Sequence, residues 1–333
     1  MLRRQSRKRD INVKQGTLRI GLAILAALAL AVGFAACGSS NSNSGTSSSG
    51  AGASTTPAGQ PGKGKPAVTL GDKNFTEQFI LGQLYRQALE AKGYTVRLKD
   101  NIGSTEIADK ALRSGDIDLY PEYIGIFNTA VAGDTKAYGT VAEAYAAGRA
   151  YAERHGFTLL PLTPFTDVDA LAVKPAYAQK NNLASVADLA KIRGLRLGGP
   201  PEFRKRETGL VGLARVYGIR DVKFSPLTIG LQYQALDSGK VDTADVFTTD
   251  GQLQGGRYTV LRDPKNVFGF QNVTPVVSSR VLGAEGPEFQ ATIDAVSQKL
   301  TTEAMQRMNA AVAIDKQSPA DVARAYLQAN GLL

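Results

Sequence analysis

The chain has 333 residues, with 39 Lys and Arg against 30 Asp and Glu, a net charge of +9, one Cys and no Trp. Seven of the basic side chains and one acidic side chain lie in residues 1–36, so the chain from Cys37 onward has a net charge of only +3. This balance does not favour a nucleic-acid-binding protein. A single cysteine also excludes an internal disulfide.

The N-terminus predicts export. Its basic residues precede an apolar run at 20–36, which ends in small residues and is shorter than the roughly 20 residues that a membrane span needs. This pattern is typical of a secretory signal peptide, here residues 1–36. Cys37 follows as in a bacterial lipobox, where the Cys is lipidated and becomes the mature N-terminus, although Phe34 stands where that motif prefers Leu. An uncleaved anchor with an incidental Cys is the alternative, and both place the protein at the outer face of a membrane.

Residues 37–66 are predicted to form a tether. This segment is rich in Gly, Ser, Asn, Thr, Ala and Pro and has almost no bulky apolar side chains, so it cannot bury enough surface to fold. About 267 residues remain from Ala67 to the C-terminus. That length is sufficient for two lobes of roughly 100–150 residues each.

The folded part alternates predicted strands with predicted helices. The expected strands are 68–71, 94–99, 117–120, 157–160, 170–173, 195–198, 222–225, 241–246, 259–261 and 276–279. The expected helices are 75–92, 104–114, 123–131, 141–155, 186–191, 209–217, 229–238, 287–300, 301–313 and 318–330. This alternation predicts an α/β fold with mostly parallel strands.

Two helix starts have capping signals. Asn74 is a candidate N-cap for the first helix, and Glu77 follows it at capping-box spacing. The last helix opens with Ser318, Pro319 and Asp321, which are an N-cap, a proline in the first helical position and an acid in the first turn.

One pattern occurs twice. Residues 111–123 (ALRSGDIDLYPEY) and 235–247 (ALDSGKVDTADVF) share the skeleton Ala-Leu-x-Ser-Gly-x-(Ile/Val)-Asp. Each copy ends a predicted helix at a Gly and leads into a predicted strand. We expect two similar α/β lobes, with residues 120–123 and 245–250 lining the two sides of a cleft, because ligands bind at strand ends in such sheets. Chance recurrence of a common helix ending is the alternative.

The sequence offers few groups for catalysis. His155 is the only His and is expected to be a surface or capping residue. No Cys/His cluster, metal-ligand spacing or phosphate-binding Gly-rich loop occurs. We therefore predict no enzyme activity, no cofactor and no metal, and expect a receptor that closes over its ligand by hinge motion.

Four motifs point to a known family. They are GDKNFTEQ at 71–78, GSTE at 103–106, DLYPEYIG at 118–125 and GPPEF at 199–203. In this order they resemble the substrate-binding proteins of glycine betaine/choline/osmoprotectant ABC importers, over about residues 68–333. The resemblance implies a type II periplasmic-binding-protein fold, with two doubly wound mixed sheets joined by two hinge crossovers. It places domain I at 68–166 plus 272–333 and domain II at 167–271.

The resemblance also implies a ligand-binding site. Lys73 and Arg206 match the cations that grip the ligand carboxylate in this family, with Arg204 or Lys205 as alternatives for the second. Tyr123 matches one of four Tyr that surround the ligand's quaternary ammonium.

Two further positions bear on the predicted site. Asn74, beside Lys73 in the first motif, is another candidate ligand residue. Ile126 departs from the family pattern, because it replaces a Thr that contacts the ligand carboxylate in the family.

The remaining three cage positions are not Tyr. Asp169, Phe247 and Gln271 stand there, unless Tyr233, Phe268 or Phe270 supplies a ring instead. Because a carboxylate accepts hydrogen bonds that a ring face cannot, Asp169 favours a zwitterionic or amine-containing solute over glycine betaine itself.

The resulting prediction is an extracytoplasmic lipoprotein, anchored through Cys37, that captures a small zwitterionic or cationic solute between its lobes. It would deliver a quaternary ammonium such as glycine betaine, choline or carnitine, or a related zwitterion, to an ABC permease and its ATPase subunit. We expect a monomer without nucleic-acid partners. The alternatives are a receptor for an amino acid or other amine, an enzyme on the same fold that uses His155, and a ligand-gated sensor subunit.

Overall fold

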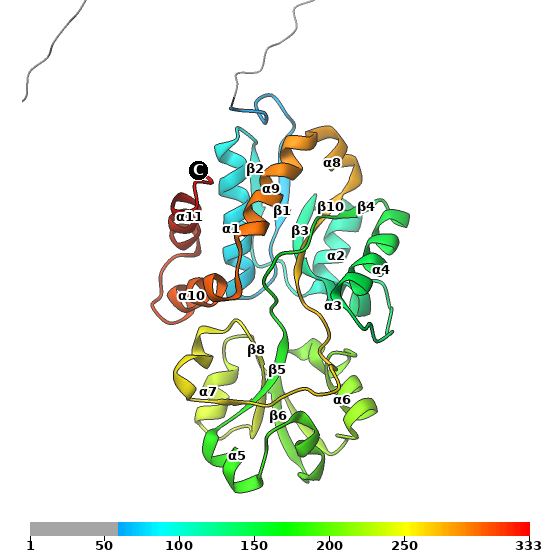
Figure 1. Cartoon of the computed structure of the whole chain (residues 1–333), viewed down its shortest axis with the longest axis vertical. Coiled ribbons are helices and arrows are strands. Elements are labelled where there is room, and N and C mark those ends of the chain that lie inside the picture. The colour runs from blue at the N-terminus through cyan, green and yellow to red at the C-terminus, as the bar shows by residue number, and fades with distance from the viewer. Residues whose placement is uncertain (1–58) are drawn as a thin grey trace, which may run out of the picture. The chain divides into compact units, whose positions relative to one another are not determined.

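The structure, a computed structural model, describes residues 59–333. These residues form two lobes, each built on a five-stranded sheet (Figure 1). The predicted signal peptide, the predicted lipidation site Cys37 and most of the predicted tether lie outside the described residues.

Lobe I contains the sheet β2-β1-β3-β10-β4. Its strands are β1 (Val68–Gly71), β2 (Val96–Lys99), β3 (Leu119–Tyr123), β4 (Phe157–Leu159) and β10 (Val273–Ser278). One face packs against α1 (Thr76–Ala91), α9 (Pro287–Lys299), α10 (Thr302–Ala313) and α11 (Pro319–Ala329). The other face packs against α2 (Thr105–Ser114), α3 (Ile124–Ile126) with the π-helical turn η1 (Phe127–Val131), and α4 (Val141–Arg154). The short helix α8 (Ser279–Glu285) follows β10.

Lobe II repeats this layered arrangement around the sheet β7-β6-β8-β5-β9. Its strands are β5 (Asp169–Val173), β6 (Leu195–Gly199), β7 (Val222–Pro226), β8 (Thr243–Phe247) and β9 (Thr259–Val260). Its helices are α5 (Pro175–Asn181), α6 (Leu210–Tyr217), α7 (Gln232–Asp237) and the 3-10 turns η2 (Val186–Lys191), η3 (Pro201–Arg204) and η4 (Gly251–Gly256). Buried apolar clusters lie on both faces of the sheet, so each lobe has three layers.

The sheets are mixed, and the expectation of mostly parallel strands is wrong. In lobe I, β1 pairs in parallel with β2 and β3, but β10 is antiparallel to β3 and β4. In lobe II, β6 is parallel to β7 and β8, whereas β5 is antiparallel to β8 and β9. The antiparallel strands β5 and β10 are the ones that directly follow an interlobe crossing, so no helix of their own lobe links them to a preceding strand.

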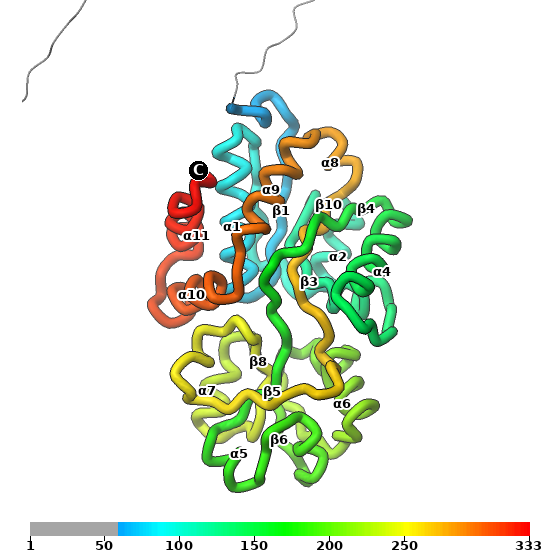
Figure 2. Tube along the Cα trace, in the orientation of Figure 1, coloured from blue at the N-terminus to red at the C-terminus, as the bar shows by residue number. Residues whose placement is uncertain are grey.

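Two chain segments connect the lobes. The chain leaves lobe I after β4 and returns before β10, and the two connections run close together (Figure 2). They are joined by a bridge between Thr166 and Asn272, and the Asp167 amide donates a hydrogen bond to the Gln271 carbonyl at 3.1 Å. The predicted domain boundaries fall in these connections and stay a prediction.

In both lobes the repeated pattern forms the same link, which is a pair of hydrogen bonds between its Asp and a residue of a neighbouring strand. After α2, Asp118 accepts a hydrogen bond from the Thr69 amide at 2.8 Å, and its own amide donates to the Thr69 carbonyl. After α7, Asp242 does the same with Arg196, accepting at 3.1 Å. The Gly before each link has a positive φ, 77° at Gly115 and 68° at Gly239, which ends the helix. Each link directs the following strand toward the cleft.

One capping prediction is wrong and one is confirmed. The N-cap of α1 is Phe75 rather than Asn74, and no side chain caps this helix. Glu77 is instead buried and bound to other elements. Ser318 does cap α11, accepting a hydrogen bond from the Asp321 amide at 3.2 Å. The helices α5 and α8 were not predicted.

Candidate ligand-binding site

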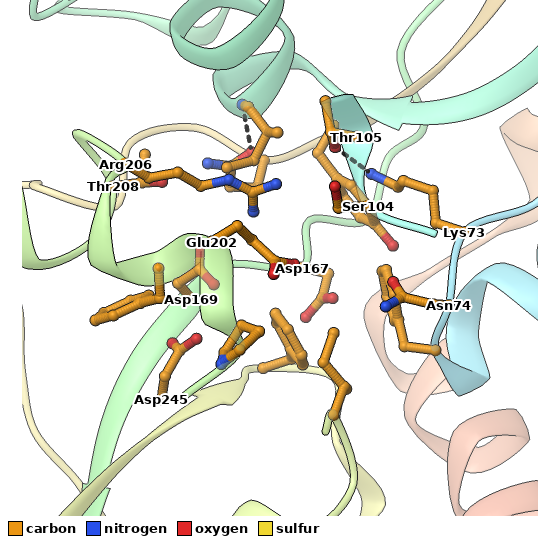
Figure 3. A pocket seen from close by; sticks show the side chains of 18 residues that line it. Lys73, Asn74, Ser104, Thr105, Asp167, Asp169, Glu202, Arg206, Thr208 and Asp245 are labelled. Atoms are coloured by element: carbon orange, nitrogen blue, oxygen red, sulfur yellow. Dashed lines mark hydrogen bonds between the residues drawn. The ribbon is translucent and has the colours of Figure 1, made fainter. Parts of the chain in front are cut away.

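A cavity of about 40 Å³ lies between the lobes at the ends of their strands. The end of β3 contributes Tyr123 from lobe I, and β5 and β8 contribute Asp169 and Phe247 from lobe II. The loops after β1 and β6 contribute Lys73 and Arg206 (Figure 3). This volume is far below the roughly 300–1,000 Å³ of typical ligand pockets, so the described arrangement is a closed one.

Lys73 is a buried cation with partners in its own lobe. The residue is 3% exposed, and its ammonium donates to Thr105 Oγ1 at 3.1 Å and forms an ion pair with Glu122. Burial lowers the pKa of Lys73, and the charge of Glu122 opposes that shift. Lys73 is therefore at the predicted place, but its charge is already balanced.

Three aromatic rings form one wall of the cavity. Phe75 stacks on Tyr123 at 6.1 Å and on Phe247 at 5.4 Å between ring centroids. The Lys73 ammonium lies 4.6 Å from the centroid of the Tyr123 ring. Such a stack presents ring faces that attract cations. The protein's own ammonium occupies one of these faces in the closed arrangement.

Arg206 spans the two lobes. Its guanidinium donates to both carboxylate oxygens of Glu106 on α2, at 3.0 and 3.1 Å. Burial alone would raise the pKa of Glu106, but the hydrogen bonds and charge of Arg206 outweigh it and bring that pKa to about 2. Neither alternative residue lines the cavity: Arg204 lies over the Phe224 ring at 5.1 Å, and Lys205 is exposed.

Four carboxylates line the cavity from lobe II and the adjoining connection: Asp167, Asp169, Glu202 and Asp245. Asp245 is 1% exposed, and neither of its oxygens has a hydrogen-bond partner among the described residues. Burial raises the pKa of Asp169 to about 6 and raises the pKa values of Asp167 and Asp245 well above their usual range. Asp167 accepts a hydrogen bond from the Thr249 amide at 3.1 Å.

Gln271 contacts the cavity but is fully engaged with the protein. Its amide nitrogen donates to the Phe268 carbonyl at 2.8 Å, and its oxygen accepts from the Ile126 amide at 3.2 Å. A Cβ at Gly125 would lie 2.6 Å from the Gln271 amide nitrogen, so the glycine provides room for this side chain. Gln271 therefore shapes the wall of the cavity.

The structure brings together all seven residues that the sequence analysis proposed as ligand contacts: Lys73, Asn74, Tyr123, Asp169, Arg206, Phe247 and Gln271. Their contact with a ligand stays a prediction. None of the alternative rings Tyr233, Phe268 and Phe270 lines the cavity.

Two central residues of the cavity were not predicted from the sequence. Phe75 lies inside the first motif, and its place directly after Asn74 was the available signal. Asp245 belongs to the stretch expected to line the cleft, but nothing in the sequence singled it out. Thr208 also lines the cavity, and it had no signal at all.

Outside the cavity, His155 is exposed, stacks on Tyr151 at 4.0 Å between ring centroids and does not contact the site. Within residues 59–333, no set of three His, Cys, Asp or Glu is placed to hold a metal ion. The same residues contain no helix with the length and apolar character needed to cross a membrane.

The chain matches a family model, two relatives and a solved structure whose descriptions all name glycine betaine, carnitine or choline. The family model for the substrate-binding domain of ABC-type glycine betaine transport systems matches residues 66–329. The chain is 33% identical to a glycine-betaine-binding protein of Pseudomonas aeruginosa, over 80% of this chain and 88% of that protein. It is 27% identical to a carnitine transport binding protein of Listeria monocytogenes, over 81% and 88% of the two chains. A crystal structure described as a glycine betaine/carnitine/choline ABC transporter superposes with a TM-score of 0.64 at 28% identity, over 80% of this chain and 99% of that one.

Proposed function

Because the chain belongs to the family of substrate-binding proteins of ABC-type glycine betaine transport systems, as its motifs predicted, we propose that it captures a small quaternary-ammonium solute between its lobes. The observation that supports this proposal is the stack of Tyr123, Phe75 and Phe247 along a cavity between two hinged lobes. A quaternary ammonium has no hydrogen-bond donor, so ring faces are the groups best suited to hold it.

Hinge closure would couple binding to delivery. The lobes must separate to admit a solute, because the closed cavity of about 40 Å³ is too small to hold one. The closed form would then present one combined surface of both lobes to an ABC permease with its ATPase subunit. We propose that the chain acts in this way as a monomeric receptor and not as an enzyme.

The anchor is part of the same proposal. The basic and apolar N-terminal segment and Cys37 support export, signal cleavage and lipidation, which would hold the receptor at the outer face of the membrane. Mass spectrometry of the mature protein should find an acylated N-terminal peptide that begins at Cys37. An intact segment of residues 1–36 in that protein would contradict the proposal.

The aromatic wall can be tested by calorimetry on the full chain with choline, carnitine and glycine betaine. Phe75→Leu keeps an apolar side chain of similar size but removes the ring face. We expect it to weaken binding of the preferred quaternary ammonium by roughly 5- to 30-fold, the usual range for a desolvated cation–π contact.

The matched control is Phe157→Leu, which changes a partly buried ring of β4 that does not line the cavity. This variant should bind like the unchanged protein. Equal affinity of the Phe75→Leu variant and the unchanged protein would contradict the role of the wall, and no binding of any quaternary ammonium would contradict the proposed function itself.

A further inference from the structure

Acidic side chains outnumber basic ones along the cavity. Its two cations already have acidic partners in lobe I, Lys73 with Glu122 and Arg206 with Glu106. Four further carboxylates, Asp167, Asp169, Glu202 and Asp245, have no cationic partner within salt-bridge distance among residues 59–333. Burial favours the protonated forms of Asp167, Asp169 and Asp245, and a ligand with net positive charge would favour their ionised forms instead.

Asp169 and Asp245 face the cavity from neighbouring strands. In the antiparallel pairing of β5 and β8, Asp169 is opposite Phe247, and Asp245 lies two residues before Phe247. Side chains two residues apart on a strand share a face, so both carboxylates lie on the face of the sheet that carries the Phe247 ring. Figure 3 shows the two at the same side of the cavity.

Gly199 on the neighbouring strand β6 leaves space for the Asp245 side chain. A Cβ at Gly199 would lie 3.2 Å from the Asp245 Cβ, tighter than ordinary contact. The absence of a side chain at Gly199 therefore lets the Asp245 carboxylate approach β6 and remain in contact with the cavity.

The buried Asp245 carboxylate lacks a hydrogen-bond donor. Both Asp245 oxygens are buried and have no hydrogen-bond partner among the described residues. Asp169 is itself a carboxylate, and it can donate to Asp245 only if one of the two holds a proton. Buried polar atoms in native proteins are nearly always hydrogen-bonded, so a group of unpaired acceptors at a ligand cavity indicates that the ligand provides the donor.

We propose that Asp169 and Asp245 form a subsite that accepts a hydrogen bond from an O–H or N–H group of a net-cationic ligand. The proposal rests on the proposed function, because it assumes that the ligand's ammonium is held at the aromatic wall. Choline has both features, a permanent cation and one hydroxyl donor. Glycine betaine has neither, since it is a zwitterion without an O–H or N–H group.

The test compares choline with its methyl ether by calorimetry on the full chain. The two ligands have the same trimethylammonium group, and only choline has the hydroxyl donor. A hydrogen bond to a charged acceptor in a buried site corresponds to roughly 10- to 100-fold in affinity, so we expect choline to bind tighter than the ether by about this factor. Glycine betaine should bind more weakly than choline.

Substitutions then locate the acceptor. Asp245→Leu keeps a side chain of similar size without any acceptor and should abolish the preference for choline over the ether. Asp245→Asn keeps a neutral acceptor and should leave an intermediate preference. The control Asp315→Asn changes an exposed acid beyond α10 and should leave the preference unchanged. Melting temperatures of all variants establish that they are folded.

The outcomes separate this proposal from the proposed function. Equal affinity for choline and its ether, or tighter binding of glycine betaine than of choline, would overturn the donor subsite and leave the quaternary-ammonium receptor intact. Binding of ethanolamine alone, lost in Asp245→Leu, would support the subsite and overturn the preference for quaternary ammonium groups. No binding of any of the four probes would overturn both.

Discussion

At the scale of one residue, Asp72 shows how burial changes the pKa of an acid. It directly precedes Lys73, is 1% exposed and accepts one hydrogen bond, from the Asn101 amide at 2.6 Å. Its second oxygen has no partner among the described residues. Burial raises the pKa of Asp72 to about 7, although the Asn101 hydrogen bond acts to lower it. Unlike Asp245, Asp72 does not line the cavity, so its ionisation affects folding without direct ligand contact.

We expect Asp72→Asn to remove part of the pH dependence of stability. Between its unfolded pKa of about 4 and its folded pKa of about 7, folded Asp72 keeps a proton that the unfolded chain has lost. The contribution of Asp72 to the free energy of unfolding is therefore full below about pH 4 and is lost as pH rises toward 7. Asn does not titrate, so the variant should gain stability relative to the unchanged protein across this range.

Urea unfolding at pH 4.5, 6 and 8 measures this difference. The control Asp315→Asn changes an exposed acid, and its stability relative to the unchanged protein should not rise between pH 4.5 and 8. A stability difference between the Asp72→Asn variant and the unchanged protein that is the same at all three pH values would contradict the raised pKa.

At the scale of an element, the helix ends determine where the strands begin. Gly115 ends α2 with φ of 77°, a backbone conformation that residues with a Cβ seldom adopt. No atom lies within 4 Å of a Cβ built on Gly115, so only the backbone requires glycine there. The strand β3 that follows brings Tyr123 to the cavity, which makes this helix end part of the construction of the site.

We expect Gly115→Ala to lower the free energy of unfolding by about 1 kcal/mol, because a Cβ is disfavoured in the left-handed region. Gly283→Ala is the matched control, since Gly283 is an exposed glycine within α8 that has an ordinary helical backbone and free space around its Cβ. The control should raise stability by up to about 1 kcal/mol. Urea unfolding curves give both values. If Gly115→Ala leaves the free energy of unfolding unchanged, α2 can end without a left-handed glycine.

At the scale of the whole molecule, two sets of contacts hold the lobes together. On one side, Arg206 of lobe II binds Glu106 of lobe I. On the other, Thr249 donates to buried Glu77 on α1 at 2.6 Å, and Asn309 on α10 donates to the Thr249 carbonyl at 3.1 Å. Glu77 also accepts from the Tyr123 hydroxyl at 2.7 Å, which joins this interlobe contact to the aromatic wall.

Gly251 allows the second set of contacts to form. A Cβ at this position of η4 would lie 2.7 Å from the Cα of Ala310 on α10, so an added methyl group requires the two elements to separate. We expect Gly251→Ala to favour the open form. Its radius of gyration without ligand, measured by small-angle X-ray scattering, should increase, and ligand affinity should fall because fewer molecules are closed.

The Gly283→Ala variant is again the control and should scatter and bind like the unchanged protein. If Gly251→Ala changes neither the radius of gyration nor the affinity, α10 moves together with η4 and closure does not depend on this contact.

The sequence by itself determined the features that depend on neighbouring residues. Helix ends at Gly115 and Gly239 and the Ser318 cap were predicted because such signals act within a few residues along the chain. The family motifs further placed Lys73 and Arg206 at the cavity. The Asn74 cap failed because the same local pattern is compatible with Glu77 bonding to Tyr123, Thr249 and Asn309, which are distant in sequence.

Only the tertiary structure decided how these residues meet. Phe75 joins Tyr123, 48 positions away, and Phe247, 172 positions away, into one wall because the fold brings these distant residues together. The lack of a donor at Asp245 likewise depends on the fold. The pairing of Lys73 with Glu122 and of Arg206 with Glu106 likewise depends on the fold, and it gives both cations partners within the protein, which the motifs alone did not indicate. Local sequence signals determine where helices and strands begin and end. Burial and the choice of hydrogen-bond and ion-pair partners depend on how these elements pack in three dimensions.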